Sequence, residues 1–553
     1  MKTPRIQILA PPQGEPPRPN LDPDILAGHL SDASSLPGGR AIGILRARSA
    51  DEIASFMRHT SGSGTHVLPI GSQSSLTGAS VPMNDLIVCT NGLDRVEPVE
   101  EQSETSARVR AGAGVLLRDL QAHVGRVGWF YPPVPTYDLA CLGGTIATNA
   151  AGSATFKYGS TRSWVSWMRV VLESGWIVDI PRGACVATPG STVTLPLPDG
   201  GRIDVPIPSY QGPAVKKASM GYSGGNAIDL IDLFIGSEGT LGIIVEAEVE
   251  LVRVPPMVLG VLVFVDEETR AVDLVAELRS MSRATWNSGD LEGIDVRAIE
   301  HLDGASLDLL RRSGVMQRLK APIPPDARMC LIMELELKRK IDDREIQDQF
   351  EAAFTRRDHA PSGGISSFLE LVGRFNLLDR IELALPSDPG SLSRLKELRE
   401  AVPATVNEIV REMQREKDPR ISKLAGDMCV PFEHFAESLE VYRSAFETRG
   451  LDHVIFGHIS DGNVHPNVIA RSHEQYLAGQ QALLEVADWV QSIGGSPLAE
   501  HGVGRNPIKK QLLERYYGHA AIEEMRQVKR AFDPEGRLAR GVLFDMKEPI
   551  VRS

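Results

Sequence analysis

The chain has 553 residues, which at about 100–200 residues per domain is enough for two or three domains. Its hydrophobic content of 42% and charged content of 24% are those of an ordinary globular protein, and the formal net charge of −13 argues against a nucleic-acid binder. An acidic chain that handles an anionic substrate must gather its cations at one site.

Cysteine spacing and the N-terminal sequence indicate the compartment. Five scattered cysteines include no C-x-x-C pair, which argues against a zinc ribbon, an iron–sulfur cluster or a redox dithiol and fits a reducing environment. Residues 1–20 are proline-rich and lack the apolar core of a signal peptide. The most apolar stretch, 258–265, is far shorter than the roughly 20 residues that span a bilayer. We expect a cytoplasmic protein, with peripheral membrane contact left open.

The sequence predicts an α+β protein with four segments. Residues 1–39 are expected to form an irregular arm, and 40–255 a domain of strands, helices and many glycines that holds a large cofactor by its backbone. Residues 256–499 are expected to form a second α+β domain; the family resemblance carried by the motifs below implies that this domain is a cap and that 500–553 is a C-terminal segment that returns to the first domain.

Strand and helix patterns in the first domain and the cap alternate along the chain. Four runs before the cap are typical of strands, namely 65–71, 85–90, 106–111 and 168–180. In the cap, 257–265 and 330–337 are also strand-like. A helix over 266–280 is expected to open at Asp266, and a second over 342–357 places four apolar residues on one face: Ile346, Phe350, Ala353 and Phe354.

A loop of small residues follows the first of these strands. It reads Pro69-Ile70-Gly71-Ser72-Gln73-Ser74-Ser75-Leu76-Thr77-Gly78. Such residues allow backbone N–H groups to approach a diphosphate, although a plain Gly/Ser loop has the same composition. A later Gly112-Ala113-Gly114 lacks the third glycine of a dinucleotide fingerprint and is interpreted as a strand-to-helix turn.

Three further blocks are rich in small residues. They are Tyr131 to Thr136, Gly143 to Gly152 with Lys157 to Arg162, and Phe234 to Ile244, which contains Gly236-Ser237-Glu238-Gly239-Thr240. In this order, these blocks and the first loop resemble the FAD domain of the vanillyl-alcohol oxidase / p-cresol methylhydroxylase flavoprotein family.

The resemblance implies a two-subdomain FAD-binding domain followed by a cap with an antiparallel sheet. It also implies these FAD-binding residues: Pro69, Gly71, Ser72, Gln73, Ser74, Ser75, Thr77, Pro135, Thr136, Gly143, Gly144, Ala147, Asn149, Gly152, Tyr158, Glu238, Gly242 and Ile244. Glu238, Gly242 and Ile244 are expected near the adenosine end. The usual Gly-Gly-Gly-Thr run is here Gly71 to Ser74. No histidine lies in that loop, so we expect non-covalent FAD and a structural role for His66.

A histidine pair flanks a turn late in the chain. Asp461-Gly462 between two β-rich runs predicts a hairpin. With these two residues as the loop, His458 faces His465 on one side of the sheet, at a Cβ separation of about 4.5–5.5 Å that lets both imidazoles reach one ion. A satisfied polar pair would have the same spacing.

Glu500 and His501 lie in a glycine-rich loop, 494–504. Adjacent Glu and His can supply one ligand and one base, and His and carboxylate ligands suit Zn²⁺ or Mn²⁺. A solvated polar turn is the alternative.

The hairpin and this loop resemble the D-lactate, D-2-hydroxyglutarate and glycolate dehydrogenase branch of the same family. That resemblance implies three metal ligands, His458, His465 and Glu500, and His501 as the base beside the flavin. Arg399 and, more weakly, Lys423 match the cations that hold the substrate carboxylate, and an arginine fork suits that task. A surface pair between Arg399 and Glu400 is the alternative.

The resemblance implies FAD-dependent oxidation of a small D-2-hydroxy acid to a 2-oxo acid, assisted by a divalent metal. The electron acceptor is expected to be a quinone, a cytochrome or a flavoprotein, and a homodimer is left open. An alkylglycerone-phosphate-synthase-like enzyme is a rival, but that group carries a histidine-rich loop where this chain has Glu500-His501. A non-catalytic electron-transfer subunit is the second rival, and the histidines argue against it. At the C-terminus, Ala539-Arg540-Gly541 replaces the usual Asn-Pro-Gly.

Overall fold

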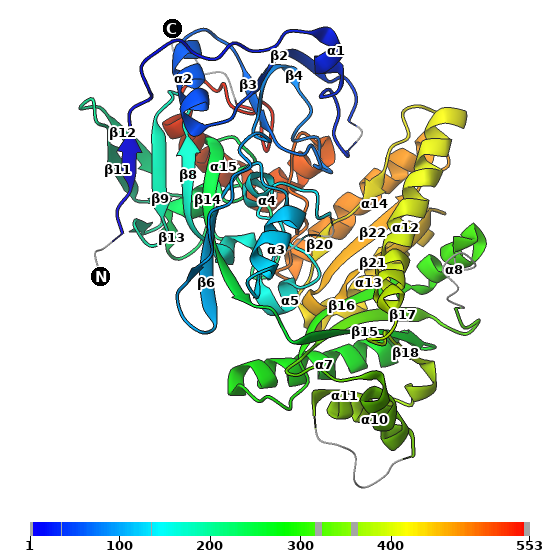
Figure 1. Cartoon of the computed structure of the whole chain (residues 1–553). Helices are drawn as coiled ribbons and strands as arrows, with labels where there is room; N and C mark the ends of the chain where they lie inside the picture. Colours follow the sequence, from blue (N-terminus) through cyan, green and yellow to red (C-terminus); the bar gives the residue numbers. More distant parts are fainter. Residues whose placement is uncertain are drawn as a thin grey trace.

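The computed structural model describes residues 4–34, 36–133, 135, 137–315, 323–355 and 363–546. Two sheets make up its first half (Figure 1). The smaller, parallel sheet has three strands in the order β2 (Arg40–Arg46), β4 (Met83–Cys89) and β3 (Val67–Ile70). The larger, antiparallel sheet has the order β1 (Gln7–Leu9), β9 (Ile177–Pro181), β8 (Val165–Val171), β14 (Ile243–Arg253), β6 (Ser106–Gly112) and β5 (Glu100–Glu101), with β7 (Trp129–Phe130) also on β14. These sheets are the two subdomains that the FAD-domain resemblance implies.

Short helices and small ribbons connect these strands. The helices are α1 (Pro23–Ala27), α2 (Ala50–Thr60), α3 (Leu117–Gly125), α4 (Leu142–Ala147), α5 (Thr155–Tyr158) and α6 (Leu230–Phe234). Two antiparallel ribbons pair β10 (Val186–Ala187) with β13 (Ile228–Asp229) and β11 (Thr192–Pro196) with β12 (Arg202–Pro206). The N-terminal arm is less irregular than expected, because β1 adds to the edge of the large sheet beside β9 and α1 is capped by the Asp22 side chain.

The cap is an antiparallel sheet of eight strands. Its order is β18 (Ile381–Leu383), β15 (Met257–Val265), β17 (Met329–Leu337), β16 (Val296–Asp303), β21 (Asp452–His458), β22 (Asn463–Ile469) and β19 (Leu424–Ala425), with β20 (Met428–Cys429) also on β22. The helices around it are α7 (Glu268–Ser288), α8 (Gly304–Ser313), α10 (Asp343–Thr355), α11 (Gly364–Arg374), α12 (Pro389–Glu416), α13 (Phe435–Glu447) and α14 (His473–Ser492).

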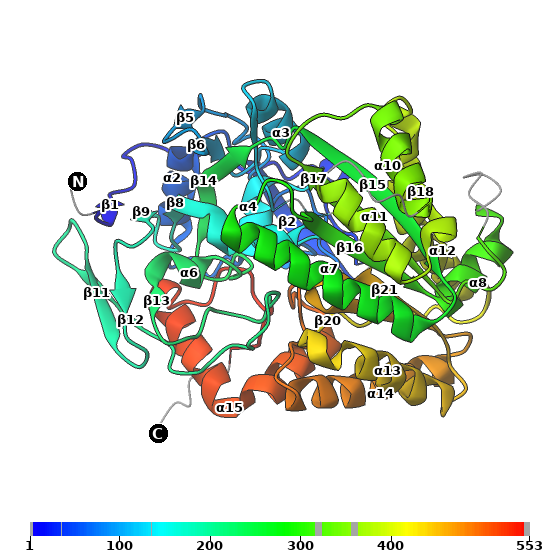
Figure 2. The same ribbon diagram turned by 90° about the horizontal axis from the view of Figure 1, so that it is seen from below.

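Helices cover both faces of the cap sheet, as Figure 2 shows for α7 and α11 on one side. Alternate residues of β15 point to opposite faces, so Leu262 and Phe264 join the cluster with α8 and α12, whereas Val261 and Val263 join the cluster with α7. This burial on both faces explains the continuous apolar run at 257–265.

Two details of the predicted cap helices were wrong. The helix α7 begins at Glu268 rather than at Asp266, and its N-cap residue, Glu267, makes no side-chain capping bond. On α10, Phe354 is 61% exposed, because the buried side of this helix is formed by Ile346, Gln349 and Ala352.

The C-terminal segment returns to the first half of the molecule. The helix α15 (Pro507–Phe532) is kinked at Gly518, and the chain beyond it bridges the strand β3 through Val67 and Leu538. Arg537, which is 1% exposed, pairs with Glu173 at 2.5 Å. The last elements therefore pack against the first (Figure 1).

The longest helices, α12 and α15, carry charged residues throughout. Over the ranges that the structure describes, no helix combines the length and the apolar character that crossing a membrane requires.

Candidate active site

A cavity lies where the glycine-rich loops of the first half meet the C-terminal segment. Thirteen of the predicted FAD-binding residues line it: Pro69, Gly71, Ser72, Gln73, Ser74, Ser75, Pro135, Gly143, Gly144, Ala147, Glu238, Gly242 and Ile244. Glu500 and His501 also line it. The predicted cofactor loops and the predicted base therefore share one cavity.

The glycines in this wall are needed for close approach. A Cβ on Gly71 would lie 2.1 Å from the sulfur of Cys141, and a Cβ on Gly143 would lie 2.5 Å from the Cβ of Ala113. Because neither contact leaves room for a side chain, larger residues would displace the loops that form the wall. A backbone-lined cavity of this kind fits a cofactor held by main-chain groups.

Four predicted FAD-binding residues do not line the cavity. Thr77 is 1% exposed beneath it, and the Gly152 N–H donates to Thr155. Asn149 uses its side chain to hold the backbone of Ala218 and Arg162. The Tyr158 hydroxyl donates to the Glu336 carboxylate of the cap at 2.6 Å, so it links the two halves of the chain instead of the cofactor. Thr136 lies outside the described residues.

The histidine hairpin is formed by β21 and β22, but its register differs from the prediction. His458 pairs with Asn463 and His465 pairs with Phe456, because residues 459–462 form the turn instead of Asp461-Gly462 alone. The shift of two positions in pairing preserves the face of the sheet. The two imidazoles therefore still lie on one side, with ring centroids 5.4 Å apart.

Both imidazoles converge on one carboxylate oxygen. Nε2 of His458 lies 3.2 Å from Oε1 of Glu500, and Nε2 of His465 lies 3.3 Å from the same atom. Ligands held about 2.0–2.1 Å from a tetrahedral Zn²⁺ lie about 3.3–3.4 Å from one another. The distances from both histidines to Glu500 therefore fit ligands of a shared divalent ion.

A second carboxylate, Glu300 on β16, holds His458 from its other ring nitrogen. Oε1 of Glu300 lies 2.7 Å from Nδ1 of His458 and 2.8 Å from Nε of Arg399. Burial alone would lower the pKa of His458, but the carboxylates Glu300 and Glu500 together outweigh burial and raise that pKa to about 9. Arg399 is thus paired with Glu300 and not with Glu400, the partner that the alternative interpretation named.

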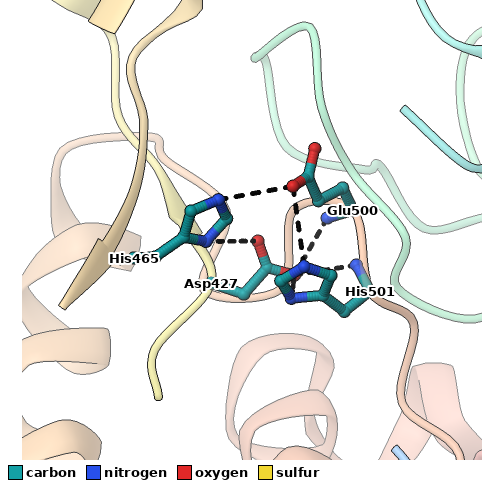
Figure 3. Close-up of side chains that lie close together, drawn as sticks. All are labelled: Asp427, His465, Glu500 and His501. Atoms are coloured by element: carbon teal, nitrogen blue, oxygen red, sulfur yellow. Dashed lines mark hydrogen bonds and ion pairs between the residues drawn. The ribbon is translucent and has the colours of Figure 1, made fainter. Parts of the chain in front are cut away.

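Asp427 organises the loop that carries the predicted base (Figure 3). Its Oδ2 accepts the backbone N–H groups of Glu500 at 3.0 Å and His501 at 2.8 Å, and it lies 3.2 Å from Nδ1 of His501. Burial opposes the charge of Asp427, but His501 and Lys509 hold the pKa of this carboxyl well below its ordinary value. A carboxylate on Nδ1 fixes the ring and leaves Nε2 to act as a base.

Two sets of side chains could hold a metal ion. Among the described residues, ligand atoms of Asp427, His465, Glu500 and His501 lie within 4.8 Å of one another (Figure 3). The set predicted from the sequence contains His458 in place of Asp427 and His501. The Asp427 oxygens already accept several N–H groups. The set predicted from the sequence does not include this carboxylate, so its ligand atoms are more available to an ion.

Glu238 anchors the same loop from the first domain. Its two oxygens accept the N–H groups of Val503 at 2.8 Å and Gly504 at 2.9 Å. Burial raises the pKa of this carboxyl to about 7, although the two amides oppose that shift. Two buried carboxylates, Asp427 and Glu238, therefore hold the loop from the cap and from the first domain.

Three site residues were not predicted from the sequence. Asp427 lies four residues after Lys423 and was not singled out, and Glu300 is a carboxylate buried on the strand β16, which is a signal for a functional group. Lys217 is fully buried, and nothing in its sequence neighbourhood indicates that.

Asp427→Asn is expected to lower kcat/KM by about 10–100-fold, the usual cost of losing a residue that orients a ligand or base. An asparagine offers a single acceptor oxygen, so if that oxygen keeps the N–H groups of Glu500 and His501, the N–H₂ group replaces Oδ1 and faces the donor Nδ2 of Asn463. Steady-state kinetics on protein with a matched FAD content measures the effect. Wild-type kcat/KM in this variant would contradict the orienting role.

Comparisons with known proteins agree with this architecture. Residues 41–181 match the model described as FAD binding domain, and residues 268–543 match the model described as FAD linked oxidases, C-terminal domain. A solved structure of alkyldihydroxyacetonephosphate synthase shares the fold with a TM-score of 0.55 at 15% identity, over 91% of this chain and 76% of that one.

Curated relatives cover nearly the whole chain. The glycolate oxidase subunit GlcD of Bacillus subtilis is 25% identical over 91% of this chain and 88% of its own length. A D-2-hydroxyglutarate dehydrogenase of Stutzerimonas stutzeri is 25% identical over 96% and 97%. A D-lactate dehydrogenase of Anaerostipes hadrus is 24% identical over 89% and 87%.

The two-domain fold, the cavity and these matches define an FAD-binding oxidoreductase. The chain belongs to the FAD-linked oxidase family, in the branch of the D-lactate, D-2-hydroxyglutarate and glycolate enzymes.

Proposed function

We propose that this protein oxidises a small D-2-hydroxy acid of the D-lactate, glycolate or D-2-hydroxyglutarate class to the 2-oxo acid. One observation carries the proposal: Glu500 and His501 line the same cavity as the glycine-rich loops predicted to hold FAD. The names of the relatives supply the substrate class.

We assign the divalent ion, Zn²⁺ or Mn²⁺, to His458, His465 and Glu500. The charge of the site favours a cation once His458 is neutral, as a metal ligand must be. Three buried carboxylates, Asp427, Asp461 and Glu300, and the partly buried Glu500 face three cations, Lys217, Arg399 and Lys509. Nδ1 of His465 is buried and has no hydrogen-bond partner among the described residues. An ion bound here would displace the proton that His458 carries.

Bound in this cavity, FAD would supply a hydride acceptor, and an ion held by His458, His465 and Glu500 would supply the Lewis acidity that lowers the pKa of the substrate hydroxyl. His501 takes the hydroxyl proton at Nε2 while Asp427 holds Nδ1. C2 loses a hydride, and the C–O bond becomes the carbonyl of the 2-oxo acid. A second oxidant, either a quinone, a cytochrome or a flavoprotein, then takes the electrons.

Two cations are assigned to the substrate carboxylate, Arg399 and Lys423. Lys423 is exposed to solvent, although partial desolvation by the protein packed around it lowers the pKa of its ammonium to about 8, and within the described ranges no hydrogen bond or ion pair holds it. A bound carboxylate would offset this desolvation. Lys423 directly precedes β19, whose Ala425 pairs with Asn467, two residues beyond His465.

We expect FAD to be bound without a covalent link. The loop 71–78 contains no histidine, and His66 upstream of it lies 3.2 Å from Arg540, with a pKa that burial lowers. These contacts agree with a structural role for His66.

An anaerobic reduction screen tests the function. The yellow holoprotein is expected to bleach on addition of D-lactate, glycolate or D-2-hydroxyglutarate, and the L enantiomers of the two chiral acids serve as controls. An alkylglycerone-phosphate-synthase-like enzyme or an electron-transfer subunit would keep its oxidised flavin spectrum with every acid, and that result would refute the proposal.

A further inference from the structure

Lys217 is a fully buried lysine beside the proposed metal ligands. Its Nζ donates to Oε2 of Glu500 at 2.9 Å and to Oδ1 of Asn463 at 3.2 Å, and it lies 3.3 Å from Oδ2 of Asp461. Its side chain is 0% exposed. Two carboxylates, Glu500 and Asp461, therefore lie within 3.3 Å of this Nζ, an arrangement that pairs a buried ammonium with opposite charge.

Because of this contact, the two oxygens of the Glu500 carboxylate have different partners. Oε2 faces the Lys217 ammonium, whereas Oε1 faces Nε2 of both His458 and His465. An ammonium at 2.9 Å and a divalent ion cannot both lie against Oε2, because like charges repel strongly in a buried site. Lys217 therefore leaves one oxygen of Glu500 for an ion.

A hydrogen-bond chain extends the influence of Lys217 to the proposed base. Asn463, which accepts from Lys217, donates through Nδ2 to Oδ1 of Asp427 at 3.3 Å. Asp427 in turn holds the backbone and Nδ1 of His501. One buried cation from the first domain thus supports both the ligand and the base.

We propose that Lys217 is a positioning residue that keeps Glu500 a one-oxygen ligand, so that a coordination position stays open for the substrate. The inference rests on the proposed metal-assisted oxidation. Catalytic metal sites keep one such position, and a carboxylate bound through both oxygens would fill it. A lysine that only filled space or balanced charge would not change the number of ligands around the ion.

Lys217→Met tests the inference, because methionine keeps the unbranched shape and removes the charge. Lys217→Gln retains an N–H donor and replaces the first variant if that one does not hold FAD. The control is Lys216→Met, since the exposed Lys216 donates to the Phe156 carbonyl and lies outside the site. Each FAD-loaded protein is stripped with a chelator and reloaded with Zn²⁺.

Two measurements are made on each protein. One is the zinc X-ray absorption spectrum with and without D-lactate or D-2-hydroxyglutarate, and the other is the steady-state kcat/KM for the same acids. Lys217→Met is expected to gain an oxygen neighbour around zinc, to show no further change with substrate, and to lose about 10–100-fold in kcat/KM. The Lys216→Met protein is expected to match the wild type in both readouts.

The outcomes separate the inference from the proposed function. Unchanged zinc coordination in Lys217→Met, with a normal response to substrate, would overturn the role of Lys217 alone. Wild-type protein that oxidises the acids but binds no zinc or manganese would overturn both the metal assignment and the role of Lys217. Wild-type flavin that no 2-hydroxy acid reduces would refute the proposed function itself.

Discussion

Replacement of His501 with asparagine is expected to slow reduction of the flavin by a D-2-hydroxy acid by about 10²–10⁴-fold, the usual contribution of a general base. Asparagine retains polarity near the position of Nδ1 and cannot take the hydroxyl proton at the position of Nε2. His501 lines the cavity, and its polar and ring contacts among the described residues are with Asp427, Glu500 and His465, so FAD is expected to remain bound. Anaerobic stopped-flow spectroscopy measures the rate.

Glu500→Gln is the matched comparison for this variant. It changes the adjacent residue and is expected to weaken the metal site, so that excess Zn²⁺ or Mn²⁺ partly restores its activity, whereas added metal does not help His501→Asn. Flavin reduction at the wild-type rate over the whole pH range in His501→Asn would show that the base lies elsewhere.

Removal of the divalent ion is expected to slow flavin reduction by at least about 10²-fold while FAD stays bound. A Lewis acid contributes several kcal/mol to such a reaction, and each 1.36 kcal/mol is about tenfold in rate. The two histidine ligands converge on Oε1 of Glu500, which does not belong to the loops 69–76 and 143–151 that form most of the cavity wall. Chelation of the ion is therefore expected to leave FAD bound.

The measurement compares chelator-treated, dialysed protein with the same protein after addition of Zn²⁺ or Mn²⁺. The visible flavin spectrum reports cofactor retention, and metal analysis reports the stripping. Full activity in metal-free protein would remove the metal from the mechanism and leave the imidazoles of His458 and His465 as a polar pair that Glu500 satisfies.

Local constraints explain which parts of the site could be predicted from the sequence. Gly71 and Gly143 lack room for a Cβ, and that requirement appears directly in the residue type. The common face of His458 and His465 could be predicted because an even shift in pairing preserves it, although the turn takes four residues rather than two.

Contacts between residues far apart in the sequence explain which parts of the site could not be predicted. Lys217 and Glu500 are 283 residues apart, and no pattern in 213–222 indicates that one of its two lysines is buried among carboxylates. Arg399 resembles a substrate-binding arginine, yet its pairing with Glu300 depends on how α12 packs on the cap sheet. Tyr158 likewise bonds to Glu336 of the cap, a partner that only the docking of the two halves supplies.

The return of the C-terminal segment has a consequence for biosynthesis. The cavity that accepts the cofactor is lined by Glu500 and His501, and Val67 of β3 exchanges backbone hydrogen bonds with Arg537 and Ala539. During translation the first 255 residues leave the ribosome long before these partners exist. We therefore expect FAD to bind only after synthesis of the chain is nearly complete, because until then the pocket of the nascent first domain lacks the C-terminal residues that complete it.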